Sequence, residues 1–426
     1  MTPIGILAGG GRLPLMLAQS IAARGRRVHI IAIVGEAEGA IARFPHTWVH
    51  WGEVGRIVAT LRKQGCGELV IAGAVRRPDL LKLRPDLGLL KSLPQIVPLL
   101  GGGDDSVLRR VVGFLEGKGF NVRGAHEVAP ELVAADGMIG KVRLSACELG
   151  DARLGFAVRR ALAASDAGQA VVVAQGRVLA IEGVEGTDAM LGRLARRAFP
   201  RAPRSGVLAK GPKPGQELRV DMPVIGPRTV ENALAAGLAG VVVEAGCVLI
   251  LERGEMLALA DREGCAVYGL AAHCSRPSAG EGLAHAIRRG RVIGQRRPSP
   301  RDRRDIERGL GVVDALASVG VAGAVVVART HVLAIEAGEE RAAMLKRAAS
   351  LRQWGLHGSR RLGVFVCQAR AGESEAAMRT NLQLAAEQRL AGVAVTGAES
   401  ALAHYEAAAR LADALKLFLV SFGQPQ

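Results

Sequence analysis

Residues 170–191 read AVVVAQGRVLAIEGVEGTDAML, and residues 324–345 read AVVVARTHVLAIEAGEERAAML. Fourteen of the twenty-two positions are identical, at a constant offset of 154 residues. This offset is far longer than the roughly 20–45 residues of a solenoid unit, so the chain contains a duplicated domain rather than a repeat array. The apolar runs AVVVA and VLAIE are typical of buried strands, and we predict an α/β module in both copies.

We place the first copy at residues 149–272 (copy one) and the second at residues 305–426 (copy two). The copies share the apolar framework that any fold needs. They differ in polar residues, which only a working site needs. Three of these differences are Thr187 opposite Arg341, Asp188 opposite Ala342, and Lys210 opposite Cys367. We therefore predict that copy one carries the chemistry and that copy two is a silent partner with an apolar face buried against copy one.

The composition predicts a multidomain protein of a reducing compartment, the cytoplasm. Of the 426 residues, 49% are hydrophobic and only 3% are aromatic. The best membrane candidate, residues 238–251, is shorter than the about 20 residues of a membrane span and contains Glu244. The N-terminus has no basic region or cleavage pattern of a signal peptide. The six cysteines form no C-x-x-C pair, which argues against a metal knuckle or a disulfide framework.

A basic segment, residues 273–304, separates the two copies. It is rich in arginine, proline and glycine and contributes to the net charge of +16. We predict a solvated linker. The alternative is attraction to anionic phospholipid, worth about 1 kcal/mol per basic residue near the surface. Nucleic acid is not predicted as a partner, because no aromatic residues interleave the arginines to stack on bases.

The N-terminal region alternates buried apolar runs with helical patterns, which predicts a Rossmann-like domain over residues 1–148. Three of its strands are expected at residues 4–8, 28–34 and 69–75. Open α/β sheets bind ligands beyond the carboxyl ends of such strands. The segments that follow the first and third strands are therefore candidate ligand loops.

Glycines occupy the loop after the first strand. The segment GGGRLP leads into a helix whose first turn suits Pro14, and backbone N–H groups at such an N-terminus can approach a phosphate. The segment departs from G-x-G-x-x-G, so a tight turn without a ligand is the alternative. The candidate substrate-binding residues of this domain are Gly9, Gly10, Gly11, Gly73, Arg76, Asp104 and Asp105. The two aspartates could instead cap a helix predicted at 107–116.

The segment from residue 205 to residue 229 carries the strongest chemical signal. A predicted strand ends at Lys210, and the loop that follows contains Lys213, Arg219 and Asp221 among several prolines. Prolines at this density are excluded from helix interiors and central strands, so the loop is stiff. Cations neutralise phosphate charge, and a carboxylate polarises a water or holds a divalent metal. The loop therefore predicts phosphate chemistry, with a surface ion pair as the alternative.

Seven motifs resemble the LpxI family of UDP-2,3-diacylglucosamine pyrophosphatases, in the same order, over about residues 1–270. They are IGILAGGGRLP, IAGAVRRPDL, GGGDDSVLR, GAHEVAPELVA, GQAVVVAQGRVLAIEGVEGTDAML, KPGQELRVDMPVIGPRTVENALAAGLAGVVVEAG and LADREGCAVYGL. The resemblance implies hydrolysis of UDP-2,3-diacylglucosamine to 2,3-diacylglucosamine 1-phosphate (lipid X) and UMP, a step of lipid A biosynthesis. It also implies a divalent cation, typically Mg²⁺, and a catalytic and metal-binding aspartate at Asp221.

The same resemblance implies that the N-terminal domain binds the UDP part and that copy one is the catalytic and lipid X-binding domain. It implies a cytoplasmic protein associated peripherally with the inner membrane. Family members ordinarily end near Leu270, so the degenerate copy two is an addition. The chain is then either a homodimer or a monomer in which copy two is a built-in partner.

We hypothesise that water attacks a phosphorus of the pyrophosphate, which the resemblance implies to be the α-phosphorus, and that Asp221 organises a metal or the water. Lys210 and Lys213 are predicted to offset charge on the transferring phosphoryl oxygens, where preplaced donors contribute most. Glu182 is given a scaffold role, because copy two keeps it as Glu336. The predicted substrate-binding residues of copy one are Thr187, Asp188 and Arg219.

Two other functional classes remain open at this point. A nucleotide-dependent oxidoreductase is suggested by the N-terminal strand–helix pattern, although the glycine fingerprint is imperfect. A protein that binds lipid or nucleic acid without catalysis is suggested by the basic linker. Binding of a nicotinamide nucleotide would indicate the first class, and loss of binding after deletion of 271–426 would indicate the second.

Overall fold

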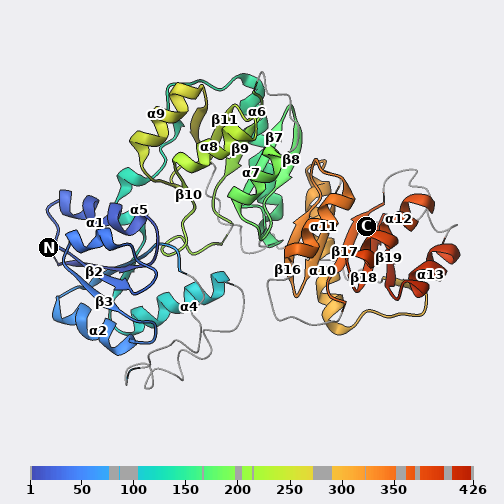
Figure 1. Cartoon of the computed structure of the whole chain (residues 1–426), viewed down its shortest axis with the longest axis horizontal. Helices are drawn as coiled ribbons and strands as arrows, with labels where there is room; N and C mark the ends of the chain where they lie inside the picture. The colour runs from blue at the N-terminus through green and yellow to red at the C-terminus, as the bar shows by residue number, and fades with distance from the viewer. Residues whose placement is uncertain are drawn as a thin grey trace.

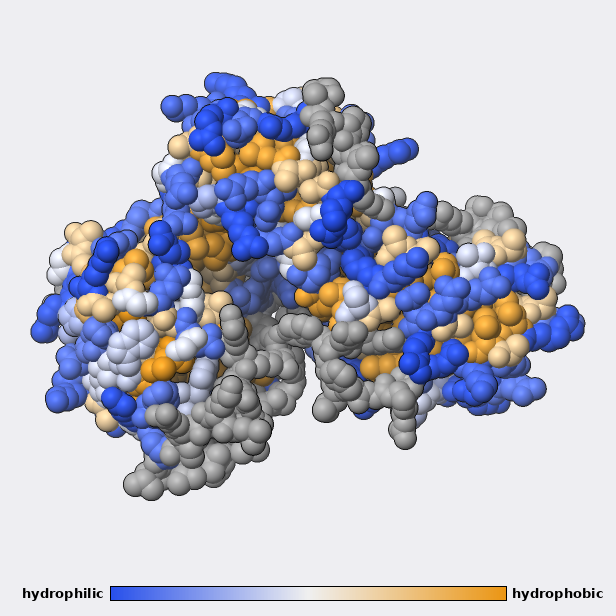
Figure 2. Space-filling view, in the orientation of Figure 1, coloured by the Kyte–Doolittle hydropathy of each residue, from blue (hydrophilic) through white to orange (hydrophobic). Residues whose placement is uncertain are grey.

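The structure is a computed structural model that describes residues 2–75, 86, 104–165, 167–196, 204–213, 215–271, 290–321, 323–351, 361–369, 375–397 and 405–423. Three α/β units follow one another along the chain, namely the N-terminal domain, copy one and copy two (Figure 1). The face shown in Figure 2 is mostly hydrophilic, with smaller hydrophobic areas on each unit. In the part of the chain that the structure describes, no helix is long and apolar enough to cross a membrane.

Five parallel strands form the N-terminal sheet, in the order β3-β2-β1-β4-β5. They are β1 Ile4–Ala8, β2 Val28–Ile33, β3 His46–Val49, β4 Glu68–Ala72 and β5 Asn121–Arg123. The α-helices are α1 Leu13–Ala23, α2 Val54–Lys63, α4 Asp104–Gly117 and α5 Ala125–Val128. The strand order reverses between β1 and β4, and the crevice beyond the carboxyl ends of such a pair is where open α/β sheets bind ligands. The Rossmann-like prediction is confirmed.

Two predicted boundaries in this domain differ from the structure. The strand expected at 69–75 ends at Ala72, because Gly73 turns the backbone with a φ of +93° that strands do not allow. The helix expected from residue 107 begins at Asp104. Pro14 lies in the first turn of α1, as predicted.

Copy one is built on a six-stranded sheet in the order β6-β13-β11-β9-β7-β8. Its strands are β6 Gly137–Met138, β7 Ala170–Ala174, β8 Arg177–Ile181, β9 Val207–Lys210, β11 Gly240–Glu244 and β13 Ala266–Leu270. Its α-helices are α6 Ala146–Ala161, α7 Thr187–Ala195, α8 Pro227–Ala235 and α9 Arg253–Glu263. A separate parallel pair, β10 Val224–Ile225 and β12 Leu249–Ile250, lies outside this sheet.

Copy two repeats the six-stranded sheet in the equivalent order β14-β19-β18-β17-β15-β16. Its strands are β14 Arg291–Ile293, β15 Ala324–Ala328, β16 His331–Ile335, β17 Val364–Gln368, β18 Gly392–Thr396 and β19 Phe418–Phe422. Its helices are α10 Pro300–Ser318, α11 Arg341–Leu351, α12 Glu375–Glu387 and α13 Tyr405–Ala414. Both hairpins show a register shift at equivalent positions, Val172/Val173 and Val326/Val327. The structure therefore confirms an α/β fold with a duplicated domain.

Each copy begins earlier in the chain than the sequence suggests. Strand β6 lies within the predicted N-terminal domain, and both β14 and the start of α10 lie within the predicted linker 273–304. These edge strands pair antiparallel with β13 and β19 but contain only two and three residues. A strand this short shows no alternating pattern, so its assignment depends on its partner strand. Residues 272–289 lie outside the described part of the chain.

One buried carboxylate has the same structural role in both copies. Asp151 of α6 accepts hydrogen bonds from the backbone N–H groups of Gln175 and Gly176 in the β7–β8 turn, at 2.9 and 2.7 Å. Asp305 of α10 does the same for the β15–β16 turn. These aspartates stabilise turns with positive φ angles rather than a site.

The two copies pack against each other through an apolar interface. One buried cluster contains Val158, Leu162 and Ile181 of copy one together with Ile306 and Leu316 of copy two. Helices α6 and α10 contribute to it from the two sides. The expected burial of an apolar face of copy two against copy one is present.

Candidate active site

Three charged residues of copy one meet at one edge of the sheet. Strands β8, β9 and β11 all run in the same direction, since β7 is antiparallel to both β8 and β9 and β9 is parallel to β11. Their carboxyl ends bring Glu182, Lys210 and Glu244 to the same side. The residue preceding β7, Gln169, reaches this edge too, because Ala170 pairs with Lys210.

Lys210 and Glu182 are both buried at this edge, with 8% and 7% of their surface exposed. The Lys210 Nζ donates to the carbonyl oxygen of Val224 at 3.0 Å, and the Thr187 hydroxyl donates to Glu182 Oε2 at 3.1 Å. Burial lowers the pKa of Lys210 and raises the pKa of Glu182, and the charge of each partner offsets this effect on the other. Lys210 and Glu182 therefore influence each other electrostatically at the head of the loop.

A largely buried ion pair anchors the start of that loop. The Arg159 guanidinium, 4% exposed, bonds to Glu244 Oε2 at 3.2 Å, to the Gln169 carbonyl at 3.0 Å and to the Pro212 carbonyl at 2.6 Å. Because the contact to Pro212 holds the backbone just before Lys213, Arg159 fixes where the loop leaves the sheet. The sequence prediction missed Arg159 and Glu244.

Gln216 connects the catalytic candidate Asp221 to the sheet edge. Its Nε2 donates to Asp221 Oδ2 at 2.5 Å, and its Oε1 accepts from the Lys213 backbone N–H at 2.8 Å and from Gln169 Nε2 at 3.4 Å. The Asp221 backbone N–H also donates to the Glu217 carbonyl at 3.0 Å. The Asp221 side chain is exposed, so the carboxylate that Gln216 holds in place faces solvent. Gln216 lies in the quoted loop motif but was assigned no role from sequence.

The same loop is attached to the N-terminal domain. Arg219 pairs with Glu217 at 2.9 Å and with Glu116 of α4 at 2.8 Å, and these carboxylates raise the pKa of Arg219 above its ordinary value. Arg109 of α4 donates to the Gly215 carbonyl at 2.9 Å. Met222 lies in the buried cluster of the N-terminal sheet. The structure thus places Arg219, a predicted substrate-binding residue, in contacts that join the two domains.

The predicted glycine loop pairs with the loop after β4. Gly10 and Ala74 exchange backbone hydrogen bonds at 2.7 and 2.9 Å. A Cβ on Gly9 would lie 2.5 Å from the Ala74 carbonyl oxygen, and one on Gly73 would lie 2.5 Å from the Gly10 oxygen. Gly11 has a φ of +84° and open space around it. Three glycines therefore allow close backbone contact, and Gly11 alone leaves room before α1.

The remaining predicted residues lie at the periphery or outside the described residues. Asp188, in the first turn of α7, accepts from Asn232 Nδ2 at 3.0 Å and pairs with Arg228 at 3.2 Å. Arg76 and the side chains of Asp104 and Asp105 lie outside the described part of the chain. The backbone of the two aspartates forms the N-terminus of α4.

Copy two has lost this arrangement residue by residue. Cys367 pairs with Ala324 as Lys210 pairs with Ala170, and it is fully buried. Glu336 is retained, and it forms an ion pair with Arg341 of α11 at 3.2 Å. The other replacements, at equivalent repeat and strand positions, are Val313 for Arg159, Gly323 for Gln169 and Thr396 for Glu244. Comparison of the repeats could have identified all three from sequence.

The chain matches two family models along most of its length. The LpxI N-terminal domain matches residues 3–132, and the LpxI C-terminal domain matches twice, at residues 135–268 and 289–420. The chain is also 43% identical, over 276 residues, to the UDP-2,3-diacylglucosamine pyrophosphatase LpxI of Caulobacter vibrioides. That match covers 98% of the relative and 63% of this chain, so this chain is longer by about one domain. These matches favour the hydrolase prediction over the oxidoreductase and binding-protein alternatives.

Proposed function

The chain belongs to the LpxI family, and from this we propose that it hydrolyses the pyrophosphate of UDP-2,3-diacylglucosamine in lipid A biosynthesis. The products are lipid X and UMP. The observation that carries this proposal is the match to a relative of that name over almost all of its length. The buried residues Lys210 and Glu182 and the Asp221 loop on copy one are consistent with phosphate chemistry.

The two domains divide the substrate between them. The uridine nucleotide binds at the crevice beyond β1 and β4, where Gly11 and the N-terminus of α1 leave room for a phosphate. The acylated sugar phosphate binds to copy one, near Thr187 and Asp188. Because the loop from 211 to 225 contacts both domains, the pyrophosphate lies beside this loop. The acyl chains keep the protein at the inner-membrane surface.

Hydrolysis proceeds by attack of one water on the α-phosphorus. A new P–O bond forms on the uridine side, the bond from this phosphorus to the bridging oxygen breaks, and the lipid X phosphate leaves. Asp221 orients the water and accepts its proton, and the Gln216 amide fixes the carboxylate for this role. Lys210 and Lys213 offset the charge that develops on the phosphoryl and leaving oxygens.

The residues around Asp221 fit a divalent cation that is bound together with the substrate. The described residues contain no cluster of three or more histidine, cysteine or acidic side chains that could hold a metal. Mg²⁺, however, is commonly bound by one or two carboxylates together with substrate phosphates and waters. Asp221 would hold such an ion when the pyrophosphate is present. When bound, the ion would neutralise charge on the pyrophosphate.

The first prediction tests the reaction itself. Wild-type protein is expected to release UMP from UDP-2,3-diacylglucosamine in the presence of Mg²⁺. Excess EDTA should stop this release, and added Mg²⁺ should restore it, because without the cation the negative charges of Asp221 and the pyrophosphate repel each other. Absence of UMP under all conditions would contradict the proposed function, whereas UMP release unaffected by EDTA would contradict the metal requirement alone.

The second prediction concerns the phosphorus that is attacked. Hydrolysis in ¹⁸O-labelled water is expected to place the label in UMP, because attack at the α-phosphorus leaves the new oxygen on the uridine side. Mass spectrometry of both products measures this, with UMP and lipid X incubated in labelled water as exchange controls. Label in lipid X would show attack at the other phosphorus and reverse the attacking and leaving sides.

A further inference from the structure

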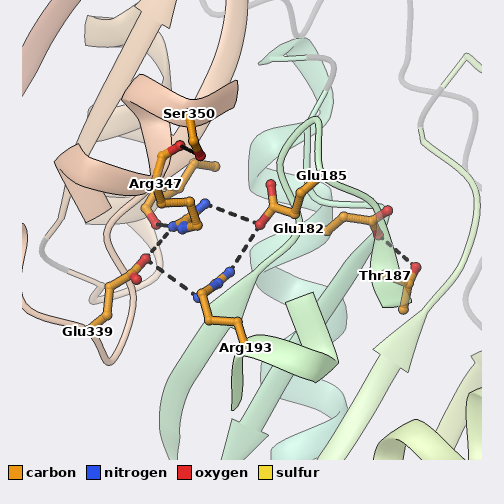
Figure 3. Close-up of polar contacts among 8 residues, drawn as sticks. Glu182, Glu185, Thr187, Arg193, Glu339, Arg347 and Ser350 are labelled. Atoms are coloured by element: carbon orange, nitrogen blue, oxygen red, sulfur yellow. Dashed lines mark hydrogen bonds and ion pairs between the residues drawn. The ribbon is translucent and has the colours of Figure 1, made fainter. Parts of the chain in front are cut away.

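Four charged side chains form a buried cluster between the two copies (Figure 3). Glu185 Oε1 pairs with Arg193 at 3.0 Å within copy one and with Arg347 of copy two at 3.1 Å. Glu339 pairs with Arg347 within copy two and with Arg193 at 3.5 Å. The four side chains are only 2–13% exposed. Two carboxylates and two guanidinium groups therefore balance their charges inside the interface.

The cluster is reciprocal. At the repeat offset of 154 residues, Glu339 is the equivalent of Glu185 and Arg347 is the equivalent of Arg193. Each arginine thus contacts the glutamate of its own copy and that of the other copy. This is the pattern of an isologous two-fold interface, in which residue i contacts j and j contacts i.

The backbone around the cluster follows the same pattern. A Cβ on Gly183 of copy one would lie 2.8 Å from the carbonyl oxygen of Leu333 in copy two. A Cβ on Gly338 of copy two would lie 2.7 Å from the carbonyl oxygen of Leu179 in copy one. Leu179 and Leu333 are equivalent residues of the repeat. The loop after β8 and the loop after β16 therefore approach each other's strands in the same way.

Glu185 also belongs to the site of copy one. It lies on the loop 182–187, between buried Glu182 and Thr187, whose side chains are hydrogen-bonded to each other (Figure 3). Burial raises the pKa of Glu182 and the nearby Glu185 carboxylate raises it further, so the two carboxylates interact electrostatically. Arg347 holds this loop from the side of copy two.

We infer that copy two occupies the place of the second subunit of a two-fold pair and that its Arg347 is a positioning residue for the working site of copy one. This inference rests on the proposed function of that site. It accounts for the residues that copy two has kept. Copy two has lost the equivalents of Lys210 and of most other polar residues at the sheet edge of the site. It nevertheless retains Arg347 and Glu339, which contact copy one.

The test compares Arg347→Gln with the control Arg410→Gln, which removes the same charge from an exposed position of α13. In Arg347→Gln we expect faster hydrogen exchange of the backbone amides of 182–187 and unchanged exchange in the N-terminal strands. The kcat for UMP release should fall about tenfold, less than the ~100-fold cost of an ångström-scale misplacement, with KM changed by less than about twofold. Arg347→Lys keeps a cation, so its kcat and its hydrogen exchange of 182–187 should lie between those of wild type and those of Arg347→Gln.

An unchanged kcat and unchanged exchange of 182–187 in Arg347→Gln would overturn the inference. A uniform rise of exchange throughout copy one, with the melting temperature lowered in proportion, would also overturn it, because that pattern indicates general destabilisation. If Arg347→Gln does not fold, Arg347→Lys carries the comparison, since it retains the charge without the two-pronged contact. If wild type releases no UMP, the proposed function fails, and the exchange measurements still decide whether Arg347 orders the loop.

Discussion

Asp221→Asn is expected to lower kcat by roughly 10²–10⁴-fold while leaving substrate affinity nearly unchanged. The asparagine keeps the size of the side chain and an oxygen for the Gln216 amide, but it cannot accept the proton of the attacking water or bind a cation as strongly. The loss therefore falls on the transition state rather than on the bound substrate. Initial rates of UMP release, together with binding of UDP-diacylglucosamine by calorimetry, measure the two effects separately.

The matched control is Glu231→Gln, which removes an exposed carboxylate from α8 of the same domain. This control should retain the wild-type rate. A rate in Asp221→Asn above about a tenth of wild type, equivalent to a barrier change of under ~1.4 kcal/mol, would remove Asp221 from the mechanism.

Lys210→Met is expected to lower both stability and activity. Loss of the ammonium removes a charge that offsets the burial of Glu182 and leaves the Val224 carbonyl without its donor, and an unsatisfied buried polar group typically costs about 1–3 kcal/mol. Copy two shows how a fold can avoid this cost, because it combines Cys367 with Arg341, which pairs with Glu336. The double variant Thr187→Arg with Lys210→Cys transfers this arrangement to copy one.

The double variant, compared with Thr187→Arg alone because Thr187 is a proposed substrate-binding residue, separates the two roles of Lys210. We expect its melting temperature to lie close to that of wild type, while its kcat falls by about 10²–10³-fold, the usual effect of removing one preplaced donor to a developing charge. Thermal unfolding and UMP release, measured on both variants, test this. Activity that recovers together with stability would show that Lys210 is needed only for folding.

Much of the fold could be predicted from the repeat and from strand periodicity. The run AVVVA became β7 and β15, and the residues VLAI became most of β8 and β16, because short runs of valine, isoleucine and leucine favour strands. The edge strands β6 and β14 and the pair β10–β12 were not predicted. Each has only two or three residues, and their pairing depends on contacts distant in sequence.

The candidate site was predictable to a smaller extent. Lys210 was expected at a strand end, and β9 ends there. Arg219 was expected to face substrate, whereas its guanidinium pairs with Glu217 and with Glu116, more than a hundred residues away in the chain. Arg159 and Gln169 precede the loop and resemble ordinary helix and turn residues. Their role appears only when the sheet brings them to the edge shared with Lys210.

The internal duplication also has a genetic consequence. In a homodimer one codon specifies both sides of a two-fold interface, so a mutation that changes one active site changes the other at the same time. Here the positions of Glu185 and Glu339, or of Arg159 and Val313, are inherited separately. One gene can thus preserve an enzyme in its first copy while the second drifts to an inactive sequence.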